Sequence, residues 1–190
     1  EVLTDLDTPL STYMKLCTAP YSYLFESVQG GEKWGRYSII GLPAKKIITV
    51  NGNQITITEK NVILEKYNID DPLAEIERIQ ETYKVAEIDG MPRFNGGLVG
   101  YFGYETIRYI ESRLNKSKKE DPLGSPDILL MVSDEVVVFD NLSGKISIIV
   151  HADPSNKNAF SIAHQRLDEL ANVLVKRYVY KTKSNNSRTV

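Results

Sequence analysis

Apolar residues in this chain recur mostly in short runs bounded by glycine, asparagine or proline, a pattern typical of β-hairpins. The strongest signal is Asn51-Gly52, where both residues tolerate positive φ and where apolar and β-branched runs at 47–50 and 54–57 lie on either side. A further strand is expected at 62–64. Residues 36–66 are therefore predicted to form an antiparallel meander.

Further strands are predicted on both sides of that meander. Residues 128–139 and 145–150 are apolar runs joined by a turn-forming Asp-Asn-Leu-Ser-Gly segment, which predicts a second hairpin. Residues 21–27 have the pattern of a strand. The glycine-rich, apolar segment 95–102 predicts a buried strand, and a short helix is expected to follow at 105–111.

Three segments carry helix signals. Thr8-Pro9 and Asp71-Pro72 each join a capping side chain to a proline that suits the first helical position, and Ser155 predicts a long helix to about Tyr178. Each helix has apolar residues at helical spacing that are expected to face inward. They are Leu10, Tyr13, Met14 and Cys17 in the first helix, Leu73, Ile76, Ile79 and Tyr83 in the second, and Ala159, Ile162, Ala163, Leu167, Leu170 and Leu174 in the third.

The order of these elements predicts the fold class. Hairpins flanked by helices, without regular βαβ alternation, predict an α+β fold with antiparallel sheets. The chain is long enough for one domain, expected at 1–178, and a basic, polar segment at 179–190 is expected to be a linker or tail.

Composition narrows the class of protein. With 42% hydrophobic and 25% charged residues, the 190-residue chain resembles an ordinary globular protein. Lys and Arg number 23 against 25 Asp and Glu, and this balance argues against a general nucleic-acid-binding role. The longest apolar runs are strand-sized, far short of the roughly 20 residues that span a membrane. No signal segment opens the chain, so a cytoplasmic location is expected.

The residue types that usually carry catalysis lie in no recognisable catalytic arrangement. The single cysteine, Cys17, excludes an internal disulfide framework and is interpreted as a core residue. His151 and His164 lack a nucleophile or metal context and are interpreted as structural. The glycines of 96–103 lack the spacing of a phosphate loop and are expected to let strands approach closely. No catalytic residue and no metal ligand is predicted here.

One polar cluster suggests ligand binding. Glu26 ends an apolar strand, Ser27 follows it, and Arg36 precedes the next apolar run. A carboxylate and a guanidinium at one strand edge, with a hydroxyl beside them, can hold the ammonium and the carboxylate of an amino acid. An internal Glu26–Arg36 salt bridge that pins the loop is the alternative, and spacing alone favours it.

Several segments resemble the N-terminal region of anthranilate synthase component I. They are LFES at 24–27 with GRYSIIG at 35–41, then FNGGLVGYFGYE at 94–105, and the opening LTDLDTPLSTYMKL. The similarity extends to about Tyr178. The related aminodeoxychorismate synthase component I shares this layout but more often has aspartate where this chain has Glu26, which favours the anthranilate synthase family.

The resemblance implies a chorismate-using lyase that makes anthranilate and pyruvate. In that family Mg²⁺ and chorismate bind in a C-terminal chorismate-binding region not expected in this chain, and a glutamine amidotransferase subunit supplies ammonia. The region present carries the feedback site for the inhibitor L-tryptophan. By resemblance Ser27 and Glu26 belong to that site, and Arg36 stands where relatives have Lys or Arg.

Three functions are therefore compatible with the sequence. The first is the N-terminal regulatory region of anthranilate synthase component I at 1–178, inactive by itself. The second is the corresponding region of aminodeoxychorismate synthase component I. The third, from a different class, is a stand-alone amino-acid-binding module. None of them implies nucleic acid or a membrane as a partner.

Overall fold

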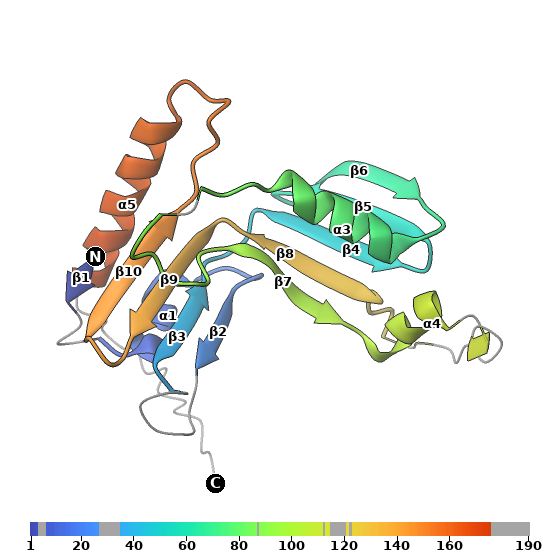
Figure 1. Ribbon diagram of the computed structural model, residues 1–190, viewed down its shortest axis with the longest axis horizontal. Coiled ribbons are helices and arrows are strands. Elements are labelled where there is room, and N and C mark those ends of the chain that lie inside the picture. Colours follow the sequence, from blue (N-terminus) through green and yellow to red (C-terminus); the bar gives the residue numbers. More distant parts are fainter. Residues whose placement is uncertain are drawn as a thin grey trace, which may run out of the picture.

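In the computed structural model, the described residues form two five-stranded antiparallel sheets (Figure 1). The structure describes residues 1–3, 7–26, 35–86, 88–111, 113–114, 121 and 123–175. Helices flank the sheets in these parts of the chain, which confirms the predicted α+β class. The end of the predicted domain at 178 and the basic tail at 179–190 lie outside the described residues.

Each sheet is built mainly from hairpins. The first sheet has the order β1 (Val2–Leu3), β10 (Lys145–Val150), β9 (Glu135–Asp140), β3 (Tyr37–Gly41) and β2 (Tyr23–Glu26). The second sheet has the order β6 (Val62–Asn68), β5 (Gln54–Glu59), β4 (Lys46–Asn51), β8 (Ile128–Ser133) and β7 (Gly97–Phe102).

The chain crosses between the sheets where the sequence predicts continuous elements. The predicted strand 128–139 is two strands in different sheets, β8 and β9, separated at Asp134. The predicted meander 36–66 is also divided, because β3 lies in the first sheet and β4, β5 and β6 lie in the second. Both predictions were wrong for the same reason. Apolar residues are typical of a buried strand in either sheet, so their pattern does not show where the chain leaves one sheet for the other.

Two tight turns shape the second sheet. The hairpin predicted at Asn51-Gly52 is confirmed, but Asn51 pairs with Gln54, so Gly52 and Asn53 form the turn and only Gly52, at 56°, has positive φ. The next hairpin turns at Lys60 and Asn61, whose φ values of 49° and 67° are both positive, as a type I′ turn requires. That second turn was not predicted from the sequence.

Two of the three helix starts are confirmed. Helix α1 (Pro9–Leu16) follows Thr8, whose Oγ1 accepts from the Ser11 N–H at 3.1 Å while the Ser11 Oγ accepts from the Thr8 N–H at 2.9 Å. Helix α3 (Pro72–Thr82) follows Asp71, whose Oδ1 accepts from two N–H groups of the first turn. These capping bonds satisfy N–H groups that the helix leaves unpaired.

Helix α5 (Ala159–Val175) begins three residues later than a helix capped by Ser155 would. The Asp153 Oδ1 accepts from the Ser155 N–H at 2.9 Å, and the Asn156 Oδ1 accepts from the Asn158 N–H at 2.9 Å. Such side-chain bonds stabilise turns in competition with a helix. The short helix predicted at 105–111 is a 3₁₀ turn, η1 (Tyr104–Thr106), followed by α4 (Ile107–Ile110).

Each sheet has a helix-covered face with its own apolar core. Helices α1 and α5 pack on the first sheet, around Ile40, Val137 and Leu170, and α3 packs on the second (Figure 1). Cys17 packs half-buried against the first core, where burial raises its pKa to about 11. The expected inner faces are only partly correct, because Leu10, Met14, Tyr83 and Ile162 are exposed.

Strand β7 is not the buried strand that its composition predicts. It forms one edge of the second sheet, and only Val99 among its residues is buried. Position 100 requires a glycine, because a Cβ there would lie 1.9 Å from the Leu129 backbone oxygen on β8. Gly100 therefore allows the close strand approach that was expected of the glycines, in a strand that leaves Tyr101 and Phe102 exposed.

Candidate functional site

Strand β2 carries the first part of the candidate site at the outer edge of the first sheet. Tyr23 anchors the strand, since its ring is buried and its hydroxyl lies 2.8 Å from the Ser133 Oγ. Side chains alternate along a strand, so Leu24 and Glu26 share the face that α1 and α5 cover. Glu26 ends the strand opposite Ser38 of β3, and its side chain is exposed.

The Glu26 carboxylate forms no hydrogen bond or ion pair with another described residue. Arg36, which the sequence offers as a salt-bridge partner, bonds elsewhere. The predicted internal Glu26–Arg36 salt bridge is therefore wrong. Ser27, the third predicted residue of the site, lies outside the described residues.

Arg36 forms a two-pronged ion pair with Asp140, at the end of β9. The Arg36 Nε donates to Oδ1 at 2.9 Å, and the Arg36 Nη2 donates to Oδ2 at 2.7 Å. The guanidinium carbon lies 4.9 Å from the centre of the Tyr37 ring, within reach of a cation–π contact. These hydrogen bonds hold the pKa of Asp140 well below its usual range.

The turn that joins β9 to β10 holds the backbone on both sides of Arg36. The Asn141 N–H donates to the Arg36 carbonyl at 2.8 Å, and the Asn141 Nδ2 donates to the Gly35 carbonyl at 3.1 Å. The same Nδ2 lies 3.4 Å from the Oγ of buried Ser38. Asp140 and Asn141 are parts of the site that were not predicted from the sequence. They lie about a hundred positions after Arg36, and their residue types indicate only a turn.

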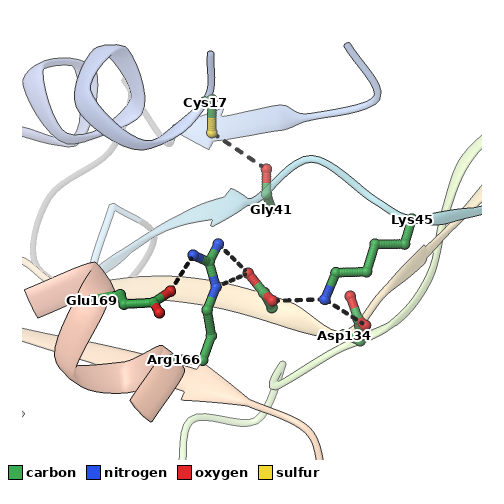
Figure 2. A network of polar contacts seen from close by, with 7 residues as sticks. Cys17, Gly41, Lys45, Asp134, Arg166 and Glu169 are labelled. Carbon is green, nitrogen blue, oxygen red and sulfur yellow. Dashed lines mark hydrogen bonds and ion pairs between the residues drawn. The ribbon is translucent and has the colours of Figure 1, made fainter. Parts of the chain in front are cut away.

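A second polar cluster lies where the chain crosses between the sheets (Figure 2). Glu135 is buried, and its carboxylate accepts from the Lys45 Nζ at 2.9 Å and from the Arg166 Nε and Nη2 at 3.0 and 2.8 Å. Lys45 lies just before β4, and Arg166 comes from α5. The cluster therefore joins both crossings to the helix, and we call it the crossing cluster.

A cavity of about 440 Å³ adjoins the crossing cluster. His151 is one of its walls, with its Nε2 2.7 Å from the Asn95 carbonyl, and Gly96 packs against the ring. His164 lies on the exposed side of α5, next to Phe160 and 3.7 Å from Asp168. These contacts support the structural interpretation of both histidines. Lys45 and Arg166 already form ion pairs with the Glu135 carboxylate, so we assign the cavity no ligand.

Glu135→Gln is expected to lower the free energy of unfolding by about 1.5–3 kcal/mol at neutral pH, because two cations lose a charged partner. Burial alone raises the pKa of Glu135, but hydrogen bonds from Arg166 and Lys45 outweigh it and lower that pKa below its ordinary value. A lowered pKa stabilises the fold above the unfolded value of about 4.3, and this contribution disappears as the pH falls through the folded value.

Urea unfolding at pH 7 and at acid pH measures that difference. The gap between Glu135→Gln and the unaltered chain is expected to close on acidification. Glu169→Gln is the matched control, because the more exposed Glu169 meets the same Arg166 only at 3.3 Å. An equal effect of both variants at pH 7, or a gap that widens in acid, would contradict the role given to Glu135.

The described residues offer no site for a metal ion. No group of three or more His, Cys, Asp or Glu side chains is placed to hold one in the parts of the chain that the structure describes. These residues thus do not fit Mg²⁺. No helix among them is both long and apolar enough to cross a membrane.

Comparisons with known proteins identify what the chain is similar to. A sequence profile of the family described as "chorismate binding enzyme" matches residues 21–189. "Anthranilate synthase component 1" of Pseudomonas putida is 57% identical over 174 residues, which cover 92% of this chain and 35% of that protein. The protein of the same name in Pseudomonas aeruginosa is 58% identical over 170 residues, covering 90% of this chain and 35% of that protein.

A solved structure supports the fold. The crystal structure of anthranilate synthase component I from Streptococcus pneumoniae TIGR4 matches with a TM-score of 0.51 and 22% sequence identity. That match covers 90% of this chain and 36% of the solved chain. The chain thus spans about a third of the length of the relatives that it matches.

Proposed function

Because this chain belongs to the family of chorismate-binding enzymes, we propose that it is the N-terminal regulatory region of an anthranilate synthase component I. The observation that carries the proposal is the 57% identity to a protein of that name over 92% of the chain. The whole protein would convert chorismate to anthranilate, as a lyase in the cytoplasm. Glu26, where the aminodeoxychorismate relative more often has aspartate, favours anthranilate as the product.

The chain by itself is inactive in this proposal. Chorismate and Mg²⁺ bind in the C-terminal chorismate-binding region, and a glutamine amidotransferase subunit supplies the ammonia. Exposed apolar side chains in the segment that connects β7 to β8 support contact with that region, since Tyr104, Ile110 and Leu123 are 91%, 73% and 86% exposed. Exposed apolar surface of this kind marks sites of interaction.

The regulatory ligand is L-tryptophan, bound at the β2–β3 edge of the first sheet. Glu26 takes the ammonium group, Ser27 contributes a hydroxyl, and Arg36 takes the carboxylate. The exposed Glu26 carboxylate at the strand end and the fixed Arg36 guanidinium support this assignment. Tryptophan inhibits by binding the less active state more tightly, and such coupling is typically worth about 1–3 kcal/mol.

The test is an assay of the whole protein that carries this region, supplied with chorismate, Mg²⁺ and ammonia. It is expected to form anthranilate, to be inhibited by L-tryptophan, and to lose all activity when reduced to the 190-residue chain. Formation of aminodeoxychorismate in place of anthranilate would overturn the proposal in favour of the second family member. Tryptophan binding by a whole protein with no turnover would instead support a stand-alone amino-acid-binding module.

A further inference from the structure

The Arg36 guanidinium has two edges that can bind a carboxylate. One edge consists of Nε and Nη2, and the other consists of Nη1 and the second N–H of Nη2. Asp140 takes the first edge, at 2.9 and 2.7 Å. No described residue accepts a hydrogen bond from Nη1, and the Arg36 side chain is 42% exposed. Arg36 thus keeps one carboxylate-binding edge while it bonds to Asp140.

Asp140 is itself held in place by the turn that it begins. Its Oδ1 accepts from the Leu142 N–H at 3.1 Å as well as from Arg36, and its side chain is only 19% exposed. Asn141 holds the Arg36 carbonyl and the Gly35 carbonyl from the same turn. Both the backbone and the guanidinium of Arg36 are therefore fixed by two consecutive residues.

We propose that Asp140 is a positioning residue of the amino-acid site, which orients Arg36 so that its Nη1 edge meets the carboxylate of the ligand. The inference rests on the proposed function. It adds to the amino-acid site a residue that neither the sequence pattern nor the family resemblance indicates. A long arginine side chain loses rotamer freedom when it binds a carboxylate, and an arginine that is already fixed loses less. Asp140 acts through Arg36 and does not touch the ligand.

The experiment measures the L-tryptophan concentration for half-inhibition in the whole protein, relative to the uninhibited rate of each variant. Asp140→Asn is expected to raise that concentration about tenfold, because the new amide keeps an acceptor for the turn but no longer matches both N–H groups of Arg36. Arg36→Gln is expected to raise it at least as much. The double variant is expected to match Arg36→Gln, because Asp140 has nothing left to position.

Asp121→Asn is the matched control. Asp121 also holds a turn, accepting from the Leu123 N–H at 3.0 Å and from the Ser125 N–H at 2.8 Å, but it pairs with no arginine among the described residues. Its substitution is expected to leave the half-inhibition concentration unchanged. If Asp121→Asn raised it as much as Asp140→Asn did, the effect would come from loosened turns and the inference would fail.

Other outcomes would also overturn the inference. An unchanged half-inhibition concentration in Asp140→Asn would mean that Asp140 has no role in ligand binding. A lowered one would mean that Asp140 competes with the ligand for Arg36. A further tenfold rise in the double variant over Arg36→Gln would mean that Asp140 acts through the fold. Failure of the unaltered protein to respond to L-tryptophan would overturn the proposed function and the inference with it, whereas loss of response in Glu26→Gln but not in Asp140→Asn would overturn the inference alone.

Discussion

Glu26→Gln is expected to raise the L-tryptophan concentration needed for half-inhibition of the whole protein by about 10- to 150-fold. The substitution keeps the size of the side chain but removes the charge that would meet the ligand's ammonium group. A hydrogen bond to a charged group is worth about 1.5–3 kcal/mol, and each 1.4 kcal/mol changes an affinity tenfold. Glu26 is exposed at a strand end, so the fold does not depend on its charge.

The half-inhibition concentrations are obtained from L-tryptophan inhibition curves of Glu26→Gln and of the unaltered protein. Glu77→Gln is the matched control, since Glu77 is an exposed carboxylate on α3 of the other sheet. The control curve is expected to coincide with that of the unaltered protein. A Glu26→Gln curve that also coincides would remove Glu26 from the tryptophan site.

Gly100→Ala is expected to destabilise the second sheet by forcing β7 away from β8. The added Cβ would lie 1.9 Å from the Leu129 oxygen and 2.9 Å from the Leu129 carbonyl carbon, and these backbone atoms have no rotamer with which to move away. Overpacking of this kind costs about 3 kcal/mol. For a chain of this size that corresponds to a fall in Tm of roughly 6–12 °C.

Thermal unfolding followed by circular dichroism measures that fall. Gly52→Asn is the control, because a Cβ at Gly52 meets nothing within 4 Å and asparagine tolerates its φ of 56°. Its Tm is expected to change by a small fraction of the Gly100→Ala shift. Equal Tm values for Gly100→Ala and the unaltered chain would mean that β7 does not approach β8 as closely as the structure places it.

Features with a local cause were predictable from the sequence. Thr8-Pro9 and Asp71-Pro72 begin helices because capping and proline act within one turn, and Asn51-Gly52 identifies a hairpin because the demand for positive φ is local. The α+β class follows from the order of such elements. Residue motifs in the chain were enough to indicate the family, which the comparisons then support.

Features that depend on distant residues were not predictable in the same way. The bend at Asp134 lies in a polar interruption of the apolar run, at residues 133–135, but that interruption does not show that the strands on its two sides belong to different sheets. The exposure of β7 depends on its position at a sheet edge, which its own composition does not reveal. Arg36 pairs with Asp140 across 104 positions, so spacing suggested the nearer Glu26 as its partner.

Hydrogen–deuterium exchange of the whole protein, with and without saturating L-tryptophan, tests the location of the amino-acid site most directly. Tryptophan is expected to slow exchange in peptides covering β2, β3 and residues 139–143, because the proposed ligand contacts Glu26 and Arg36 and the turn at Asp140 holds Arg36. Peptides of α3 are expected to exchange at the same rate in both samples. Protection confined to the cavity beside the crossing cluster, with β2 and β3 unchanged, would contradict the account.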